Sequence, residues 1–139
     1  MKASPMNKKD LSSAAVQIRR SFKLLIVDDS NIMRRRIERS QQFDELELVG
    51  TAGNGLEALE IFRKTDPDVV TMDLTMPQMD GIECISQLVA LKPAVRILVI
   101  SALADKATAV EAMEKGANGF LNKPFTDRQL NEAIADLIR

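Results

Sequence analysis

Five polar side chains lie at or just past the ends of short apolar segments of the sequence. Asp28 and Asp29 follow LLIV, Asp73 follows VVTM, Ser101 follows ILVI, and Lys123 comes just after FL. Three carboxylates gathered in one pocket would repel one another and raise one another's pKa. A hard divalent cation relieves this repulsion, and Mg²⁺ is suited because it takes oxygen ligands and keeps waters that a phosphate can displace. The three aspartates therefore indicate a magnesium site if the fold brings them together.

Lys123 and Ser101 extend this chemistry to phosphate. The lysine ammonium can pair with a carboxylate at rest and with a phosphoryl oxygen later, and the serine hydroxyl can donate a hydrogen bond. With the metal and the lysine neutralising the charge of the transferred group, the Asp73 carboxylate can act as the nucleophile. The set predicts phosphoryl transfer to Asp73.

The residue types that are absent exclude several other kinds of active site. The chain of 139 residues contains no histidine and a single cysteine, Cys84. A His-based triad, an imidazole general base and a His-rich zinc site are therefore excluded. One cysteine cannot form an intrachain disulfide, and the apolar-periodic surroundings of Cys84 favour a packed thiol over a nucleophile.

Short apolar segments alternate with longer segments of helical period from Lys23 onward. Several of the apolar segments lack polar alternation, as expected of strands covered on both faces. The predicted strands are Leu24–Val27, Leu48–Ala52, Val69–Met72, Ile97–Ile100 and Phe120–Leu121. The predicted helices are Ile32–Ser40, Gly55–Lys64, Ile82–Leu91, Lys106–Lys115 and Asp127–Ile138. This order predicts an α/β fold with a parallel sheet, right-handed crossovers and helices on both faces.

Residues at the predicted helix ends support these boundaries. A residue type that favours the N-cap position precedes every helix. These residues are Ser30, Asn54, Asp80, Asp105 and Thr126. Gly116 follows Lys115, where a glycine is expected after a helix. Ligands of such sheets bind at the carboxyl ends of the strands. The five polar side chains would thus share one crevice if the first, third, fourth and fifth strands are neighbours.

Charge and hydropathy exclude other classes of partner. The net charge of −1 produces no overall field for nucleic acid. The arginine run 34–36 is interpreted as a solvated helix face, with Met33 and Ile37 turned inward. No apolar run approaches the roughly 20 residues of a membrane span, and the N-terminus lacks the apolar stretch of a signal peptide. We expect a cytoplasmic protein with no nucleic-acid partner and no membrane insertion.

The first 22 residues stand apart from the alternating pattern. Leu11, Ala15, Ile18 and Phe22 have the spacing of a short amphipathic helix. We interpret residues 1–22 as an N-terminal extension, a short helix or a partly frayed segment, and residues 23–139 as one domain.

Four segments of the sequence, in this order, resemble the receiver domain of two-component response regulators. They are IVDDS (26–30), MDLTMPQMDG (72–81), SALAD (101–105) and NKPF (122–125). The chain is most similar to the single-domain, chemotaxis-type (CheY-like) members. The resemblance implies a flavodoxin/CheY-like sheet of strand order 2-1-3-4-5. It also implies a signalling domain that is not an enzyme, beyond self-phosphorylation and slow self-dephosphorylation.

The resemblance implies that a sensor histidine kinase phosphorylates Asp73. Asp29, Asp73 and the Thr75 carbonyl would be direct ligands of Mg²⁺, or of Mn²⁺ in its place, and Asp28 would act through water. Ser101 and Lys123 would grip the phosphoryl group.

The resemblance also implies a cis peptide bond at Lys123–Pro124 and a conformational switch. Phe120 occupies the position of the switch aromatic residue, where tyrosine is frequent. The phosphorylated domain, a monomer or a weak dimer, would then bind a downstream protein target.

Alternative functions lead to different partners. In a phosphorelay, the chain would pass its phosphoryl group to a histidine phosphotransfer protein. A haloacid-dehalogenase-like phosphatase would need a second aspartate where Thr75 stands. A flavodoxin-like cofactor site would need a phosphate-binding loop where the sequence has VDDSN.

Overall fold

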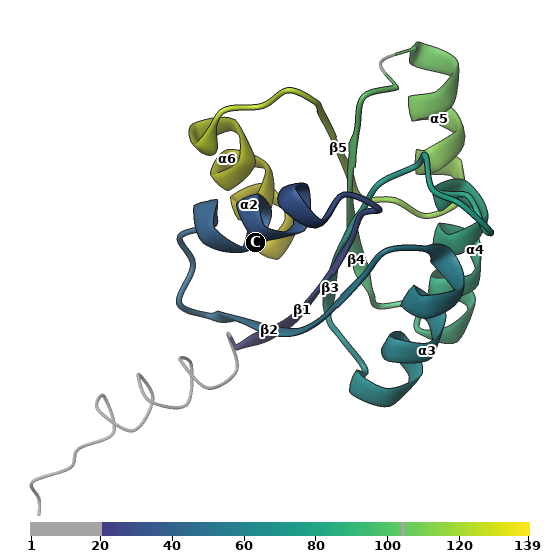
Figure 1. Ribbon diagram of the computed structural model, residues 1–139, viewed down its shortest axis with the longest axis horizontal. Helices are drawn as coiled ribbons and strands as arrows, with labels where there is room; N and C mark the ends of the chain where they lie inside the picture. Colours follow the sequence, from purple (N-terminus) through teal and green to yellow (C-terminus); the bar gives the residue numbers. More distant parts are fainter. Residues whose placement is uncertain (1–20, 104) are drawn as a thin grey trace, which may run out of the picture.

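The computed structural model describes residues 21–103 and 105–139 (Figure 1). One parallel sheet contains five strands in the order β2-β1-β3-β4-β5. The strands are β1 (Phe22–Val27), β2 (Leu46–Ala52), β3 (Val69–Met72), β4 (Arg96–Ser101) and β5 (Gly119–Asn122). The helices are α2 (Asn31–Ser40), α3 (Gly55–Thr65), α4 (Gly81–Leu91), α5 (Lys106–Glu114) and α6 (Asp127–Ile138). The predicted fold class and strand order are confirmed.

Both faces of the sheet are covered by helices. Helices α2 and α6 lie on one face, and α3, α4 and α5 lie on the other (Figure 1). Consecutive strand residues divide between two buried clusters: Leu24 and Ile26 pack on the α2/α6 side, and Leu25 and Val27 pack on the opposite side. Because Leu24–Val27 of β1 is buried on both faces of the sheet, this part of the sequence is an unbroken apolar run without polar alternation.

The predicted N-caps are confirmed at all five helices. Each cap side chain accepts a hydrogen bond from the backbone N–H three residues later, which satisfies one of the free donors of the first turn. Thr126 and Gln129 form a reciprocal capping box at α6. Gly116 has φ of 119°, a conformation that glycine adopts without strain.

Several ends of the strands and helices differ from the sequence-based boundaries by one or two residues. Two further features were not expected. The register between β1 and β2 shifts between Leu24 and Leu25, so that Val49 has no partner in the ladder. Phe22, which we assigned to the N-terminal extension, is the first residue of β1 and pairs with Leu46. The helix expected around Leu11–Ile18 falls outside the described residues.

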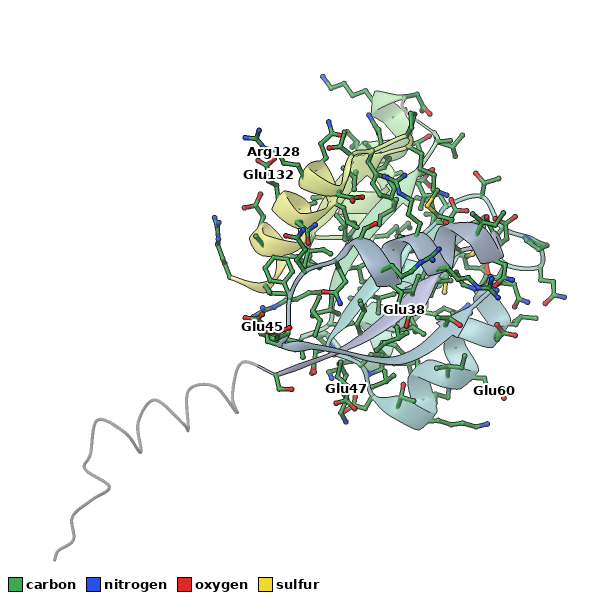
Figure 2. The ribbon with its side chains drawn as sticks, turned by 60° about the vertical axis from the view of Figure 1, so that its left-hand side comes forward. Glu38, Glu45, Glu47, Glu60, Arg128 and Glu132 are labelled. Atoms are coloured by element: carbon green, nitrogen blue, oxygen red, sulfur yellow. The ribbon has the colours of Figure 1, made fainter. Side chains whose placement is uncertain are left out.

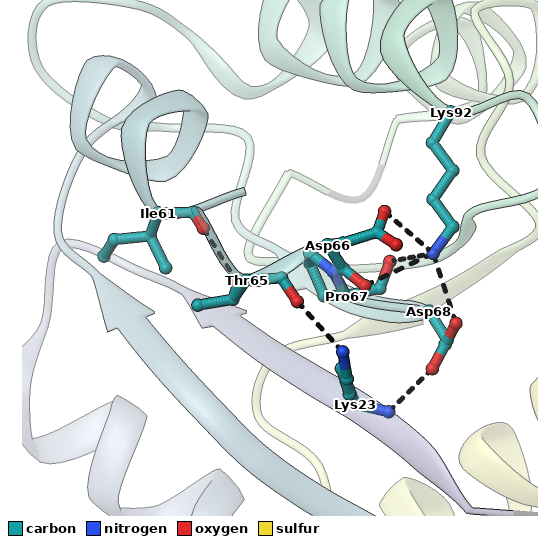
Figure 3. Close-up of polar contacts among 7 residues, drawn as sticks. All are labelled: Lys23, Ile61, Thr65, Asp66, Pro67, Asp68 and Lys92. Carbon is teal, nitrogen blue, oxygen red and sulfur yellow. Dashed lines mark hydrogen bonds and ion pairs between the residues drawn. The ribbon is translucent and has the colours of Figure 1, made fainter. Parts of the chain in front are cut away.

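A cluster of hydrogen bonds and ion pairs connects three segments at the amino-terminal end of the sheet (Figure 3). The Lys92 ammonium donates to the Pro67 carbonyl at 3.0 Å and lies 3.2 Å from a carboxylate oxygen of Asp66 and of Asp68. Asp68 also accepts from the backbone N–H of Lys23 at 2.9 Å. The cluster joins the α3–β3 and α4–β4 connections to β1, at the end of the sheet opposite to Asp28 and Asp73.

The helix surfaces carry charged side chains that face solvent. Arg128 and Glu132 project from α6 and form an exposed ion pair at 3.2 Å (Figure 2). Such pairs contribute little to stability. Within the described part of the chain, no helix has the length and apolar character required to cross a membrane.

Candidate functional site

The structure brings three carboxylates together at the carboxyl ends of adjacent strands. Asp28 and Asp29 directly follow β1, and Asp73 directly follows β3. The backbone N–H groups of Asp28 and Asp73 still donate to carbonyls of the neighbouring strands, both at 2.9 Å, so the sheet itself fixes these residues. One oxygen from each of the three carboxylates lies within 4.8 Å of the others. Asp28 and Asp73 are buried and Asp29 is exposed, so the cluster opens to solvent on one side.

Lys123 contributes an ammonium group that contacts two of these carboxylates. Its ammonium lies 2.7 Å from Asp28 Oδ2 and 3.7 Å from Asp73 Oδ2. The other oxygen of Asp28 accepts the backbone N–H of Ser30 at 2.9 Å. Both oxygens of Asp28 are therefore engaged in hydrogen bonds. The pair of Asp28 and Lys123 spans 95 residues of sequence.

The pKa of the Asp73 carboxyl group is shifted by its burial and by the neighbouring charges. Burial and the negative charges of Asp28 and Asp29 raise the pKa of Asp73, while Lys123 and a hydrogen bond from the Thr75 N–H lower it, with a net upward shift. A group of carboxylates that one ammonium only partly neutralises has the donor set and the charge that a hard divalent cation requires. The residues present therefore fit Mg²⁺.

Ser101 ends β4, the strand next to β3, and is fully buried. Its hydroxyl oxygen accepts the backbone N–H of Leu103 at 3.1 Å, and its carbonyl accepts the N–H of Lys123 at 2.8 Å. Across residues 21–103 and 105–139, no hydrogen bond joins Ser101 to the carboxylates. The structure thus places Ser101 at the expected strand end and ties its backbone to that of Lys123.

Thr75 and Pro124 lie in the loops that directly follow Asp73 and Lys123. The Thr75 N–H donates to Asp73 Oδ1 at 3.3 Å. The Lys123–Pro124 peptide bond is cis.

Gly81 supports the loop after Asp73 and was not identified from the sequence. Its N–H donates to the Leu74 carbonyl at 3.0 Å. A Cβ at this position would clash with the Asp73 carbonyl and lie 2.6 Å from Leu74 Cα. Glycine therefore allows the start of α4 to touch the backbone of the loop after Asp73. The sequence signal that could have indicated this position is its place directly after the Asp80 cap.

The interpretation of the arginine run 34–36 as a solvated face is incomplete for two of its residues, which are partly exposed but also hydrogen-bond to neighbouring loops. Arg35 is exposed. Arg34 donates to the Asp28 carbonyl at 2.6 Å, and Arg36 donates to the Phe125 carbonyl at 2.5 Å. Helical periodicity did not indicate these contacts because their acceptors are backbone atoms of the loops after β1 and β5.

Phe120, the expected switch residue, is half-buried and packs against the hydrophobic cluster on the α3–α5 side of the sheet.

The single cysteine, Cys84, is buried. Burial, with smaller contributions from Asp80 and Glu83, raises the pKa of its thiol to about 12. This agrees with a packed and unreactive thiol.

Comparison with known proteins agrees with this geometry. Residues 24–135 match the response regulator receiver domain family. The chain is 41% identical to the chemotaxis protein CheY of Listeria monocytogenes over 113 residues, 81% of this chain and 95% of that protein. It is 44% identical over 119 residues to a protein-glutamate methylesterase/protein-glutamine glutaminase of Pseudoalteromonas atlantica, covering 83% of this chain but 31% of that protein.

A solved structure shows the same arrangement of elements. It is a CheX–CheY–BeF₃–Mg²⁺ complex from Borrelia burgdorferi, similar at a TM-score of 0.81 and 30% identity over 85% of this chain and 90% of that chain. The family match spans most of the chain and agrees with the observed strand order and with the acidic cluster at the strand ends. The chain belongs to the response regulator receiver domain family and is a CheY-type receiver of two-component signalling.

Proposed function

We propose that Asp73 accepts a phosphoryl group from a sensor histidine kinase in a Mg²⁺-dependent reaction, and that the aspartyl phosphate switches a partner-binding surface. The observation that carries the proposal is the convergence of Asp28, Asp29 and Asp73 within 4.8 Å, with the Lys123 ammonium 2.7 and 3.7 Å from two of them. Several carboxylates and one lysine gathered at a partly open site, with the pKa of Asp73 perturbed by burial and neighbouring charges, are typical of a functional site.

The acidic residues have separate roles in this proposal. Asp29, Asp73 and the Thr75 carbonyl would hold Mg²⁺, or Mn²⁺ in its place, and Asp28 would act through water. When bound, the ion would neutralise charge on the transferred phosphoryl group. Asp28 would also hold the Lys123 ammonium next to Asp73 before the phosphoryl group arrives.

The chemical step requires one bond to form and one to break. A carboxylate oxygen of Asp73 attacks phosphorus, the phosphorus–nitrogen bond of a phosphohistidine breaks, and the leaving imidazole takes up a proton. Lys123 then moves its hydrogen bond from a carboxylate to a phosphoryl oxygen, and the Ser101 hydroxyl donates to another. The donor histidine belongs to the partner, because this chain contains none.

The switch would couple the phosphoryl group to Phe120. Phosphorylation would draw Ser101 toward the phosphoryl oxygens, and Phe120 would turn into the vacated space. Moving a two-state equilibrium from 1:99 to 99:1 takes about 5.5 kcal/mol. Two charge-assisted hydrogen bonds, at roughly 1.5 to 3 kcal/mol each, would supply about 3 to 6 kcal/mol. The surface formed by α5, Phe120 and α6 would thereby change its affinity for a partner.

The CheY relatives favour a chemotaxis-type output, and in the Borrelia complex such a receiver is paired with a second protein, CheX. We therefore propose a downstream protein target in the cytoplasm, with residues 23–139 as the signalling unit and no nucleic-acid partner. In this proposal the unit is a monomer or a weak dimer, and it is not an enzyme beyond slow self-dephosphorylation. The alternative, a phosphorelay intermediate, predicts rapid transfer of the phosphoryl group to a histidine phosphotransfer protein.

Intact-mass measurement after incubation with acetyl phosphate tests the proposal. We expect one phosphoryl adduct in the wild type and in Asp44→Asn. This control removes an exposed carboxylate that is not part of the acidic cluster. We expect none in Asp73→Asn or in the presence of a chelator. An adduct that persists in Asp73→Asn, or the lack of one in the wild type with Mg²⁺, would contradict the proposal. Incubating the phosphorylated protein with histidine phosphotransfer proteins separates the relay from the output function.

A further inference from the structure

Arg36 connects α2 to the loop between β5 and α6 through one guanidinium group. Its Nη2 donates to the Phe125 carbonyl at 2.5 Å and lies 3.5 Å from Asp127 Oδ1. The guanidinium carbon also lies 4.3 Å from the centre of the Phe125 ring. These three contacts join segments that are 89 residues apart in sequence.

The contacts to Phe125 are the stronger part of this connection. Asp127 is 62% exposed, so its ion pair with Arg36 is largely screened by solvent. Phe125 is 4% exposed, and its carbonyl and its ring both face the guanidinium. A planar guanidinium can donate a hydrogen bond and stack on a ring at the same time, which an ammonium cannot do in the same geometry.

The two segments that Arg36 connects, helix α2 and the β5–α6 loop, are both adjacent in sequence to residues of the acidic site. Helix α2 begins after Asp28 and Asp29, with Ser30 as its N-cap. Phe125 is two residues after Lys123. The backbone of Lys123 is held on its other side by the Ser101 carbonyl at 2.8 Å. Arg36 thus ties the helix that starts at the aspartates to the loop that carries the lysine.

We infer that Arg36 is a positioning residue for Lys123: by holding the Phe125 carbonyl and ring, it fixes the Lys123 ammonium between Asp28 and Asp73. This inference rests on the proposed phosphoryl transfer to Asp73. A displacement of about 1 Å in a charge-stabilising group can slow a reaction roughly 100-fold. A loosened β5–α6 loop would therefore impair phosphoryl transfer even though no residue that touches phosphate had been changed.

Loss of the connection has opposite effects on phosphorylation and on metal binding. Lys123 pairs with Asp28 and Asp73, and so competes with a divalent cation for the same carboxylates. Without Arg36 the pairing weakens and Mg²⁺ binds more tightly, while the lysine is no longer held where the phosphoryl oxygen arrives. A general loss of folding would weaken both functions together.

Arg36→Met, Arg36→Lys and Arg35→Met test the inference. Arg35→Met is the matched control, since it removes the same charge from the adjacent, exposed position of α2. Intact mass gives the rate of adduct formation from acetyl phosphate, calorimetry gives the Mg²⁺ dissociation constant, and urea gives the free energy of unfolding. In Arg36→Met we expect adduct formation to slow roughly ten-fold and the dissociation constant to fall roughly two- to three-fold. Arg36→Lys should be intermediate and Arg35→Met should match the wild type.

Any one of several outcomes would overturn the inference. The first is a wild-type rate of phosphorylation in Arg36→Met, and the second is an equal slowing in Arg35→Met. The third is a rate and a Mg²⁺ affinity that both fall in Arg36→Met along with the free energy of unfolding. A wild type that forms no adduct contradicts the proposed function instead. The Mg²⁺ measurement then still decides the role of Arg36, because a dissociation constant that fails to fall in Arg36→Met overturns it.

Discussion

Phe120 and Ser101 face the same side of the sheet and are separated by one pleat. Phe120 pairs with Val99 across the β4–β5 ladder, and Ser101 is two residues beyond Val99 on β4. Val99 and Phe120 both pack in the cluster on the α3–α5 side of the sheet, which is also the side that Ser101 faces. A displacement of Ser101 toward a phosphoryl group would open space that this aromatic ring can fill.

This relationship predicts that Phe120→Ala uncouples the site from the α5 surface. We expect beryllofluoride with Mg²⁺, a mimic of the phosphoryl group, to change amide hydrogen exchange in α5 and β5 of the wild type. In Phe120→Ala the same addition should leave exchange in α5 unchanged, because no ring transmits the movement of Ser101. Hydrogen exchange followed by mass spectrometry measures the effect.

Phe120→Tyr is the control for this prediction, since it keeps the ring and should keep the response of α5. An α5 response of wild-type size in Phe120→Ala would show that the coupling runs through another element.

Close approach of α4 to the acceptor loop predicts a low tolerance for side chains at position 81. Gly81→Ala would force its Cβ against the backbone of Asp73 and Leu74. We expect the free energy of unfolding to fall by roughly 1–3 kcal/mol, the range for overpacked sites, and Mg²⁺ to bind more weakly because Asp73 is displaced. Urea unfolding and calorimetry measure these changes. The exposed Ser86→Ala on the same helix is the control, and equal stability of the two variants would show that the loop yields without cost.

Local patterns in the sequence were sufficient to predict the strands, the caps and the position of the five polar residues at or just past the strand ends. Asp80 caps α4 as its residue type suggests, and Asp28 and Asp73 follow apolar strands as parallel-sheet chemistry requires. The shifted register at Leu24 and the contacts of Arg36 could not be predicted in this way. They depend on how distant segments pack, which neither periodicity nor residue type encodes.

The raised pKa of Asp73 predicts a pH-dependent gain in stability for Asp73→Asn. A carboxyl group with a higher pKa in the folded state binds more protons folded than unfolded, so the free energy of unfolding falls as pH rises through the interval between the two values. Asparagine does not ionise and escapes this loss.

In the presence of a chelator, Asp73→Asn should therefore be more stable than the wild type at neutral pH. The difference should shrink as pH falls toward the ordinary carboxyl pKa, about 3.9, and urea unfolding as a function of pH measures it. Asp44→Asn controls for the loss of one negative charge. A difference that grows toward low pH would contradict the upward shift of the Asp73 pKa.

The residues around the acceptor predict a long-lived phosphoryl group. Thr75 and Leu103 stand two residues after Asp73 and Ser101, and the side chain of Leu103 has no polar atom to orient an attacking water. We expect the adduct to persist for minutes or longer after acetyl phosphate is removed, and to decay faster in Leu103→Glu, whose carboxylate can orient water. The mass of the adduct followed over time measures this. Loss within seconds in the wild type would mean that another group activates water.

The Lys92 cluster predicts a variant that loses stability without losing the site. Lys92 is 22% exposed and holds two carboxylates and two carbonyls of the α3–β3 connection (Figure 3). Lys92→Met leaves these groups without their cation, so the free energy of unfolding should fall by roughly 1–3 kcal/mol. The rate of phosphorylation by acetyl phosphate at 25 °C should stay at the wild-type value, since the cluster lies at the amino-terminal end of the sheet.

Lys64→Met is the control for this prediction. It removes only an exposed ion pair with Glu60 and should change the free energy of unfolding by less than about 0.5 kcal/mol. A slower phosphorylation in Lys92→Met would mean that the two ends of the sheet are coupled.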